Sequence, residues 1–213
     1  IAVSLQDVLI DRFCFTMSIS GFTLTTLSVE FAGAYPTSYY SVSGGGLFIL
    51  LEDRYDWDVL HHEHGHYVAE SFSLDRNPGG THRPYEHLAE RVGKQDGIRL
   101  AWGEAWPTYF GITLQRERGS GALGIPNVGD LFYQDTEDAT FSYSIEATGS
   151  RGRGEDNEVA VQRALWDLYD SANDDRDKVS LGDQAIWNAL VPARPASMSD
   201  VSNALIANVI EED

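Results

Sequence analysis

The stretch DVLHHEHGHYVAESF, residues 58–72, holds four of the six histidines of this 213-residue chain. Asp56 and the acidic start of the stretch suit the N-cap and first turn of a helix, where carboxylates meet free amides and the positive end of the helix dipole. We therefore expect a helix over residues 57–73. On this helix His62 and His66 are four residues apart, so both imidazoles leave the same face, one turn apart.

This spacing predicts a metal site rather than a general polar patch. The pattern His62-Glu63-x-x-His66 is H-E-x-x-H, in which the two histidines can bind one zinc ion at about 2.0–2.1 Å each. Glu63 lies too far round the helix to be a ligand, but it can reach a metal-bound water. His61 and His64 have no histidine four residues away, so we interpret them as ordinary polar residues of the helix.

A catalytic zinc site needs a third protein ligand and an open position for water. The longer motif with a third histidine requires Gly at position 69 and His at position 72, where this chain has Ala69 and Phe72, so that subclass is excluded. Glu104, in AWGEAWPTYFG, is the preferred third ligand, because an unpaired carboxylate among apolar residues is costly unless a metal binds it. His82 and His87 lie in or just after the Gly-Pro loop of residues 75–84, and either could hold that loop or touch the metal.

These residues carry a family resemblance. HHEHGHYV, followed a few dozen residues later by WGEAWPTYF, resembles the gluzincin zinc metallopeptidases, most closely the bacterial and fungalysin-like groups. The resemblance implies that His62, His66 and Glu104 are zinc ligands and that Glu63 is the general base of a zinc-dependent endopeptidase. It is specific over about residues 44–111.

Two residues depart from the family pattern. Many members have an aspartate four residues after the glutamate ligand, bonded to a zinc histidine, and this chain has Thr108 there. Another carboxylate or a backbone carbonyl must then orient that imidazole. Pro107 removes a backbone donor, so we expect the helix that carries Glu104 to kink or end there.

The resemblance also implies a mechanism. Zinc lowers the pKa of a bound water from about 15.7 to about 7, and Glu63 takes the proton as the water attacks a peptide carbonyl. The strand near residues 46–51 resembles the family's edge strand, which would pair with an extended substrate; an ordinary buried strand is the alternative. A tyrosine or histidine commonly stabilises the oxyanion. The candidates for this role are Tyr169, Tyr109, His82 and His87.

The rest of the chain predicts an α+β fold. Strands are expected within residues 22–31 and 47–51. Further helices are expected at residues 85–92, 98–113, 157–170, 182–190 and 199–210, and residues 116–154 are expected to be irregular with one short hairpin. We expect one zincin-like domain, residues 1–213. Its N-terminal part, residues 1–75, would hold a small sheet packed on the zinc helix; residues 76–213 would be mainly helical, with the active-site cleft between the two parts.

Composition limits the partners. The formal net charge of −18, from 33 acidic and 15 basic residues, argues against nucleic acid and anionic membrane surfaces. No apolar run reaches the length of about 18 residues that a transmembrane helix needs. Cys14 is the single cysteine and is expected to be a buried thiol. The acidic segment DSANDDRDK, residues 170–178, is expected to be a solvated loop, with a calcium site as the alternative.

The expected partner is a protein or peptide substrate, and the family resemblance implies an extracellular or cell-envelope location. Because the chain begins at Ile1 without Met, we expect a mature form or a piece of a longer protein. Two rival hypotheses stay open. One is a non-catalytic zinc-binding module of a larger secreted protein, acting in binding or adhesion. The other is a zinc hydrolase that acts on something other than a peptide. An intact Glu63 favours catalysis, because a structural zinc site has no use for a base.

Overall fold

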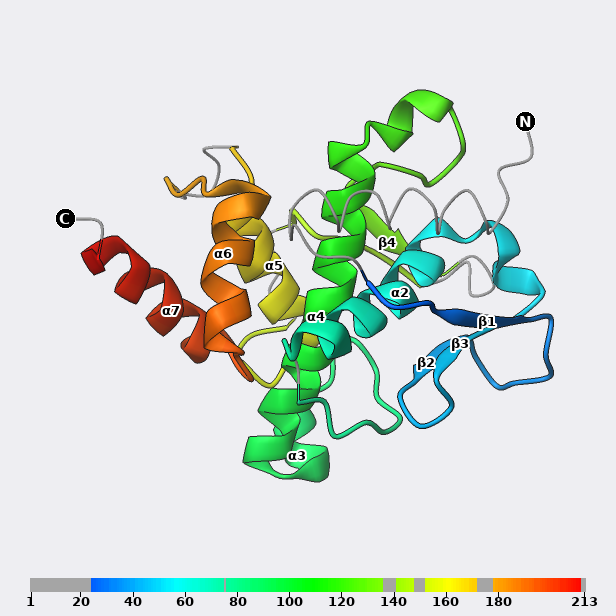
Figure 1. The fold of residues 1–213 in the computed structure, drawn as a ribbon, viewed down its shortest axis with the longest axis horizontal. Coiled ribbons are helices and arrows are strands. Elements are labelled where there is room, and N and C mark those ends of the chain that lie inside the picture. Colours follow the sequence, from blue (N-terminus) through cyan, green and yellow to red (C-terminus); the bar gives the residue numbers. More distant parts are fainter. Residues whose placement is uncertain (1–23, 75, 136–140, 148–151, 172–177, 212–213) are drawn as a thin grey trace. The chain divides into compact units, whose positions relative to one another are not determined.

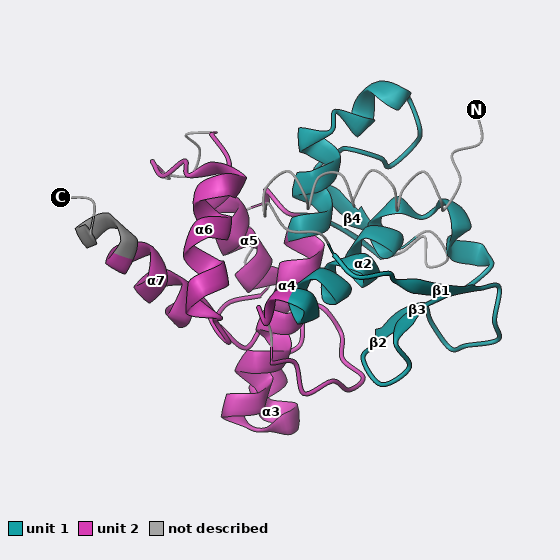
Figure 2. Cartoon of the chain, viewed as in Figure 1, with its two compact units in different colours: residues 1–71, 110–144 teal, residues 72–109, 145–213 magenta. Residues whose placement is uncertain are grey.

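The computed structural model describes residues 24–74, 76–135, 141–147, 152–171 and 178–211, and the fold of these residues is mixed α+β, as predicted (Figure 1). The chain forms two compact units, each made of two stretches (Figure 2). Unit 1 comprises residues 1–71 and 110–144, and unit 2 comprises residues 72–109 and 145–213. The predicted division after residue 75 stays a prediction.

Unit 1 contains a three-stranded sheet. Its strands are β1 (Ser28–Phe31), β2 (Tyr39–Ser41) and β3 (Gly46–Ile49), in the spatial order β1-β3-β2. The central strand β3 is parallel to β1 and antiparallel to β2. The prediction that this strand is an edge strand is therefore wrong, since it is hydrogen-bonded on both sides. The unbroken apolar run LFIL, which begins within this strand, is typical of a strand whose two faces are both buried.

The sheet shares a core with the helix that follows it. After a short 3-10 helix, η1 (Glu52–Tyr55), the motif helix α2 spans Trp57–Phe72, in agreement with the prediction. Leu47 and Ile49 of β3 are almost fully buried and lie in one cluster with Trp57 and Leu60 of α2. The unit also holds η2 (Ser120–Leu123) and the predicted hairpin, formed by antiparallel β4 (Phe132–Gln134) and β5 (Ser142–Ser144).

Unit 2 is helical in its described part. It contains α3 (Leu88–Val92), most of α4 (Lys94–Glu117), α5 (Glu158–Tyr169), α6 (Gly182–Ala193) and α7 (Met198–Glu211). Helix α6 packs on α5 and on α7. All five correspond to predicted helices, although α3 begins three residues later than expected and α4 extends further at both ends. No helix in the described part of the chain combines the length and the apolar character that crossing a membrane requires.

Helix α4 does not end at Pro107, which contradicts one of the two predicted outcomes, an end or a kink at this residue. A proline in a helix interior removes one backbone hydrogen bond and crowds the carbonyl four residues earlier, which costs about 3 kcal/mol. Nearly every residue from Leu100 to Gln115 is buried. Burial of this length of helix outweighs the local penalty. The helix therefore continues past the proline and passes from unit 2 into unit 1 after Tyr109.

Candidate metal centre

The histidine pair lies on α2, whose first turn is fixed by an aspartate. Asp56 Oδ1 accepts hydrogen bonds from the backbone amides of Asp58 and Val59, both at 3.1 Å. These amides have no partner within the helix, so the carboxylate acts as the predicted N-cap. The helix that begins here places His62 and His66 on one face, as their spacing predicts.

His62 and His66 point their Nε2 atoms at each other. The two Nε2 atoms are 3.1 Å apart and the ring centroids are 4.7 Å apart, with the ring planes nearly perpendicular. Both residues are half-buried. Two imidazole nitrogens facing each other at this distance share either a proton or a metal ion. The two nitrogens are therefore placed where they could bind one metal ion.

Glu63 lies between the two histidines in sequence and is buried. Its Oε2 accepts a hydrogen bond of 2.8 Å from the backbone N–H of Tyr40, in strand β2. Burial and the hydrogen bond from a backbone donor together fix the orientation of this carboxylate. The partner of the predicted base is thus the main chain of an edge strand.

Tyr133 is a further residue beside the histidine pair. It lies in β4, and its ring centroid is 6.0 Å from that of His62. Burial raises the pKa of the Tyr133 hydroxyl well above its usual range, and the negative charges of Asp56 and Glu63 raise it further. The hydroxyl therefore keeps its proton and is able to donate a hydrogen bond.

His61 and His64 have roles in packing. The His61 ring stacks on Trp57 with centroids 5.5 Å apart, and its Nδ1 is 3.0 Å from the Trp57 carbonyl oxygen. The His64 ring lies against Tyr67 with centroids 5.5 Å apart. Both histidines are buried. Glu70, on the same helix, is exposed.

Glu104 lies in unit 2 on α4 and is 8% exposed. Its carboxylate has a hydrogen-bond partner, so the expectation that it is unpaired without a metal is wrong. Asn77 Nδ2 donates a hydrogen bond of 2.7 Å to Glu104 Oε1. Gly103 makes this approach possible, because a Cβ at that position would lie 2.6 Å from the Asn77 Cβ. The Gly-Pro loop thus supplies a polar partner for the predicted ligand.

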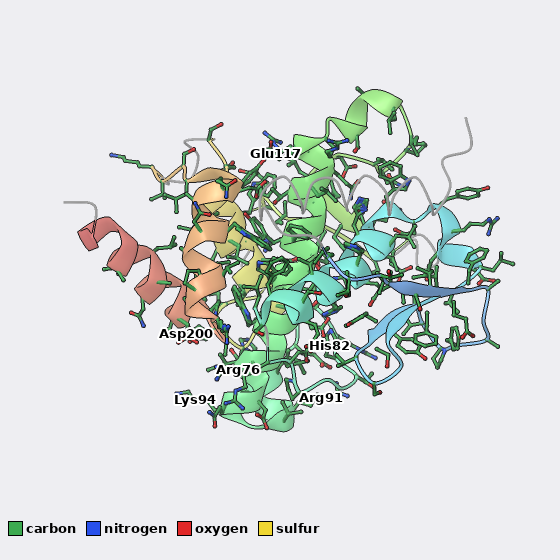
Figure 3. The ribbon with its side chains drawn as sticks, viewed as in Figure 1. Arg76, His82, Arg91, Lys94, Glu117 and Asp200 are labelled. Carbon is green, nitrogen blue, oxygen red and sulfur yellow. The ribbon has the colours of Figure 1, made fainter. Side chains whose placement is uncertain are left out.

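His82, labelled in Figure 3, comes from the same loop. It meets two buried carboxylates. Its Nε2 is 3.1 Å from Glu158 Oε2 and 3.5 Å from Glu104 Oε2, and its Nδ1 is 3.0 Å from the Gly80 carbonyl oxygen. Burial alone would lower the pKa of His82, but Glu158 and Glu104 outweigh it and raise the pKa to about 10. His82 is therefore a cation that balances these two acids.

The other predicted residues of unit 2 have separate surroundings. The hydroxyl of Thr108 donates a 3.4 Å hydrogen bond to the Glu104 carbonyl oxygen, as a helical threonine often does. Tyr109 and Tyr169, predicted oxyanion donors, pack edge to face with centroids 6.2 Å apart. His87 is exposed, and its Nδ1 is 3.3 Å from Asp156. Most of the acidic segment predicted as a loop, residues 172–177, lies outside the described residues.

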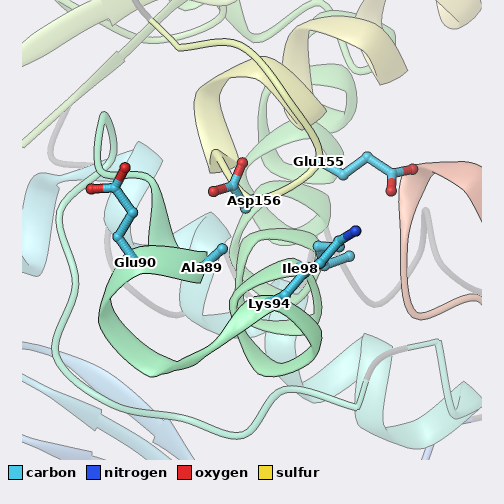
Figure 4. A pocket seen from close by; sticks show the side chains of 6 residues that line it. All are labelled: Ala89, Glu90, Lys94, Ile98, Glu155 and Asp156. Atoms are coloured by element: carbon cyan, nitrogen blue, oxygen red, sulfur yellow. The ribbon is translucent and has the colours of Figure 1, made fainter.

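Two pockets of unit 2 are separate from Glu104. One, of about 420 Å³, is lined by Ala89, Glu90, Lys94, Ile98, Glu155 and Asp156 (Figure 4). The other, of about 430 Å³, includes Arg76, Arg194 and Asp200. Neither is lined by a predicted metal ligand or by His82.

Sequence reasoning missed four residues of this region: Tyr40, Asn77, Tyr133 and Glu158. Three act through contacts between segments that are far apart in the sequence, and Tyr40 acts through its backbone, so no local pattern marks Tyr40, Tyr133 or Glu158. Asn77 alone carried a signal, since it stands in the Gly-Pro loop and directly precedes Pro78.

His62, His66 and Glu104 make up a donor set that could hold a metal ion, with one ligand atom of each within 4.8 Å of the others. Two histidines and one glutamate are the ligands of one class of catalytic zinc site. Comparison of the chain with family models, with curated proteins and with solved structures gave no match. The family resemblance therefore rests on the residues themselves.

Proposed function

We propose that the chain is a zincin-like zinc-dependent endopeptidase of the gluzincin type. In this proposal His62, His66 and Glu104 bind one zinc ion and Glu63 is the general base. The observation that carries the proposal is the pair of Nε2 atoms 3.1 Å apart, with a buried glutamate between the two histidines in sequence.

The distance within the histidine pair supports a shared metal. Two nitrogens bound to one tetrahedral zinc at about 2.0–2.1 Å stand about 3.3–3.4 Å apart. The observed separation of 3.1 Å is within a few tenths of an ångström of that value. Small side-chain rotations would therefore be enough to admit the ion.

The chemistry of the donor set supports Glu104 as the third ligand. Each of His62, His66 and Glu104 offers one ligand atom, and these atoms all lie within 4.8 Å of one another. Glu104 is 8% exposed, and a buried carboxylate is costly unless a partner such as a metal ion binds it.

The residues of the site supply the proton transfers. When bound, zinc polarises the scissile carbonyl and makes a coordinated water more acidic. Glu63 accepts a proton from the attacking water while the water oxygen bonds to the peptide carbon. The same carboxyl group then gives this proton to the amide nitrogen as the carbon–nitrogen bond breaks. Glu63 thus ends the cycle in its starting state.

The test measures zinc content and hydrolysis of an unfolded protein in the parent, in Glu63→Gln and in Glu70→Gln. We expect about one zinc per chain in all three, and a loss of roughly 10²–10⁴-fold in kcat/KM for Glu63→Gln alone. Glu70→Gln is the matched control, because Glu70 is an exposed glutamate of the same helix. Zinc in all three proteins with equal, negligible hydrolysis would refute the peptidase and favour a zinc-binding module.

A further inference from the structure

The hydrogen bond between Tyr40 and Glu63 joins the proposed base to the outer edge of the sheet. Strand β2 lies at one edge, and Tyr40 stands opposite Leu47 of β3 in the antiparallel register. Its backbone N–H donates to Glu63 Oε2 at 2.8 Å, so this N–H points away from β3. In an antiparallel ladder every second residue turns its N–H and C=O outward in this way.

An outward N–H on an edge strand is also the group that an added strand uses. An extended peptide that pairs with β2 would place a carbonyl oxygen on the Tyr40 N–H. Glu63 already occupies that donor. A single N–H cannot make two full hydrogen bonds in the same direction, so peptide pairing at Tyr40 and the bond to Glu63 exclude each other.

We propose that the Tyr40 N–H holds Glu63 in a resting position, and that an extended substrate takes over this N–H and so releases the carboxylate toward the attacking water. The inference rests on the proposed function and adds its regulation: the base becomes free only when the substrate backbone lies along β2. The site then favours extended peptides over short substrates that cannot reach the strand.

The surroundings of Tyr40 suit such an exchange. The strand is held from its other side by β3, and the Tyr40 ring packs edge to face on Tyr67 with centroids 6.0 Å apart. The Tyr67 hydroxyl in turn donates a 2.5 Å hydrogen bond to the Thr25 carbonyl oxygen. The donor is therefore fixed to the sheet, whereas Glu63 can turn about its own side-chain bonds. The moving partner is the base.

The first test replaces the Tyr40 N–H by an ester oxygen, using the hydroxy-acid analogue of tyrosine; the matched control is the parent made by the same route. Both are assayed on a blocked dipeptide and on a longer fluorogenic peptide. Because the Glu63 carboxylate is charged, breaking its hydrogen bond to the Tyr40 N–H should slow its release by about tenfold or more. We expect kcat for the dipeptide to rise by about tenfold in the ester variant, with no rise for the longer peptide.

A positioning role without exchange predicts the opposite. If the Tyr40 N–H held Glu63 in its working position, the ester would lower kcat for both substrates, and this result would overturn the inference. Zinc content and circular dichroism establish that the ester variant is folded. Tyr40→Pro, which removes the same N–H at a strand edge where proline is tolerated, is the second variant if the ester protein does not fold.

A second readout does not depend on activity. In Glu63→Ala protein with ¹⁵N-tyrosine, the Tyr40 amide should exchange with solvent faster than in the parent, because its partner is gone. A longer peptide with a reduced scissile bond should restore the protection at least tenfold. An amide that stays as open with the peptide as without it refutes the exchange. A parent enzyme that cleaves neither substrate refutes the proposed function itself, whatever the amide does.

Discussion

The side chain of His82 balances the negative charge of two buried acids. It faces Glu158 and Glu104, both buried, and its pKa is raised to about 10. In the unfolded chain an ordinary histidine has a pKa of about 6.5. The folded state thus holds the proton more tightly, so the stabilisation is complete below about pH 6.5 and is lost as the pH rises toward 10.

We therefore predict a pH-dependent gap between the metal-free parent and His82→Gln. At pH 6 the free energy of unfolding of the variant should be about 1.5–3 kcal/mol lower than that of the parent, because a charged hydrogen bond to buried acids is lost. The gap should shrink between pH 6.5 and 10 in urea titrations. His87→Gln is the control, since its exposed pair with Asp156 contributes less than about 1 kcal/mol. A gap of equal size at pH 6 and pH 10 contradicts the prediction.

Gly103 and Asn77 form a second pair whose effect is local. A Cβ at position 103 would meet the Asn77 side chain at 2.6–2.8 Å. Gly103→Ala should therefore destabilise the protein by about 1–3 kcal/mol, although alanine normally favours a helix. Adding Asn77→Ala should remove most of this extra cost, which a double-mutant cycle of urea unfolding energies measures. Stabilisation by Gly103→Ala alone would show that the loop yields freely.

At the scale of elements, α5 depends on its cap. Asn157 is fully buried; its Oδ1 accepts from the Ala160 amide and its Nδ2 donates to the Glu86 carbonyl, both at 3.0 Å. Asn157→Ala should cost about 2–4 kcal/mol, from the lost cap and the buried carbonyl left without its donor. Asn157→Ser keeps an acceptor for the cap and should cost less. Equal losses in thermal unfolding for the two variants would contradict a capping role.

Local patterns predicted the helices but not the order of the strands. The histidine spacing and the Asp56 cap define α2 within one residue at its C-terminal end, because both signals lie within a few turns of chain. Strand order depends on pairing between distant segments: β1 reaches β3 in parallel although β2 lies between them in sequence. The edge-strand prediction for residues 46–51 failed for this reason. The fully apolar sequence of that strand was the local sign of its central place.

The same distinction holds for the candidate site. H-E-x-x-H fixes the relation of His62, Glu63 and His66 because one helix carries all three. The partners of Glu63 and Glu104 come from a strand edge and a loop, so only the fold reveals Tyr40 and Asn77. The local penalty of Pro107 predicts a kink or an end of the helix, whereas burial along α4 carries the helix past this residue.

At the scale of the whole molecule, the proposed zinc ion would bind two histidines and one glutamate that lie far apart in the sequence, His62, His66 and Glu104. A ligand that binds only the folded state stabilises it by about 2.7 kcal/mol at a hundred times its dissociation constant. For a chain of this size that is a rise of about 5–10 °C in melting temperature. Chelation of the zinc should therefore lower the melting temperature by this amount.

Variants assign the effect to the ligands rather than to zinc in general. Glu104→Gln should lose most of the zinc-dependent rise, because the amide is a poor substitute for the carboxylate, while Glu70→Gln should keep it. Glu63→Gln should also keep it, since the proposed base is not a ligand. Calorimetry with and without zinc measures all four proteins. A rise in Glu104→Gln as large as in the parent would leave the histidine pair as the metal site and exclude Glu104 from it, because a variant that has lost a ligand should bind zinc more weakly.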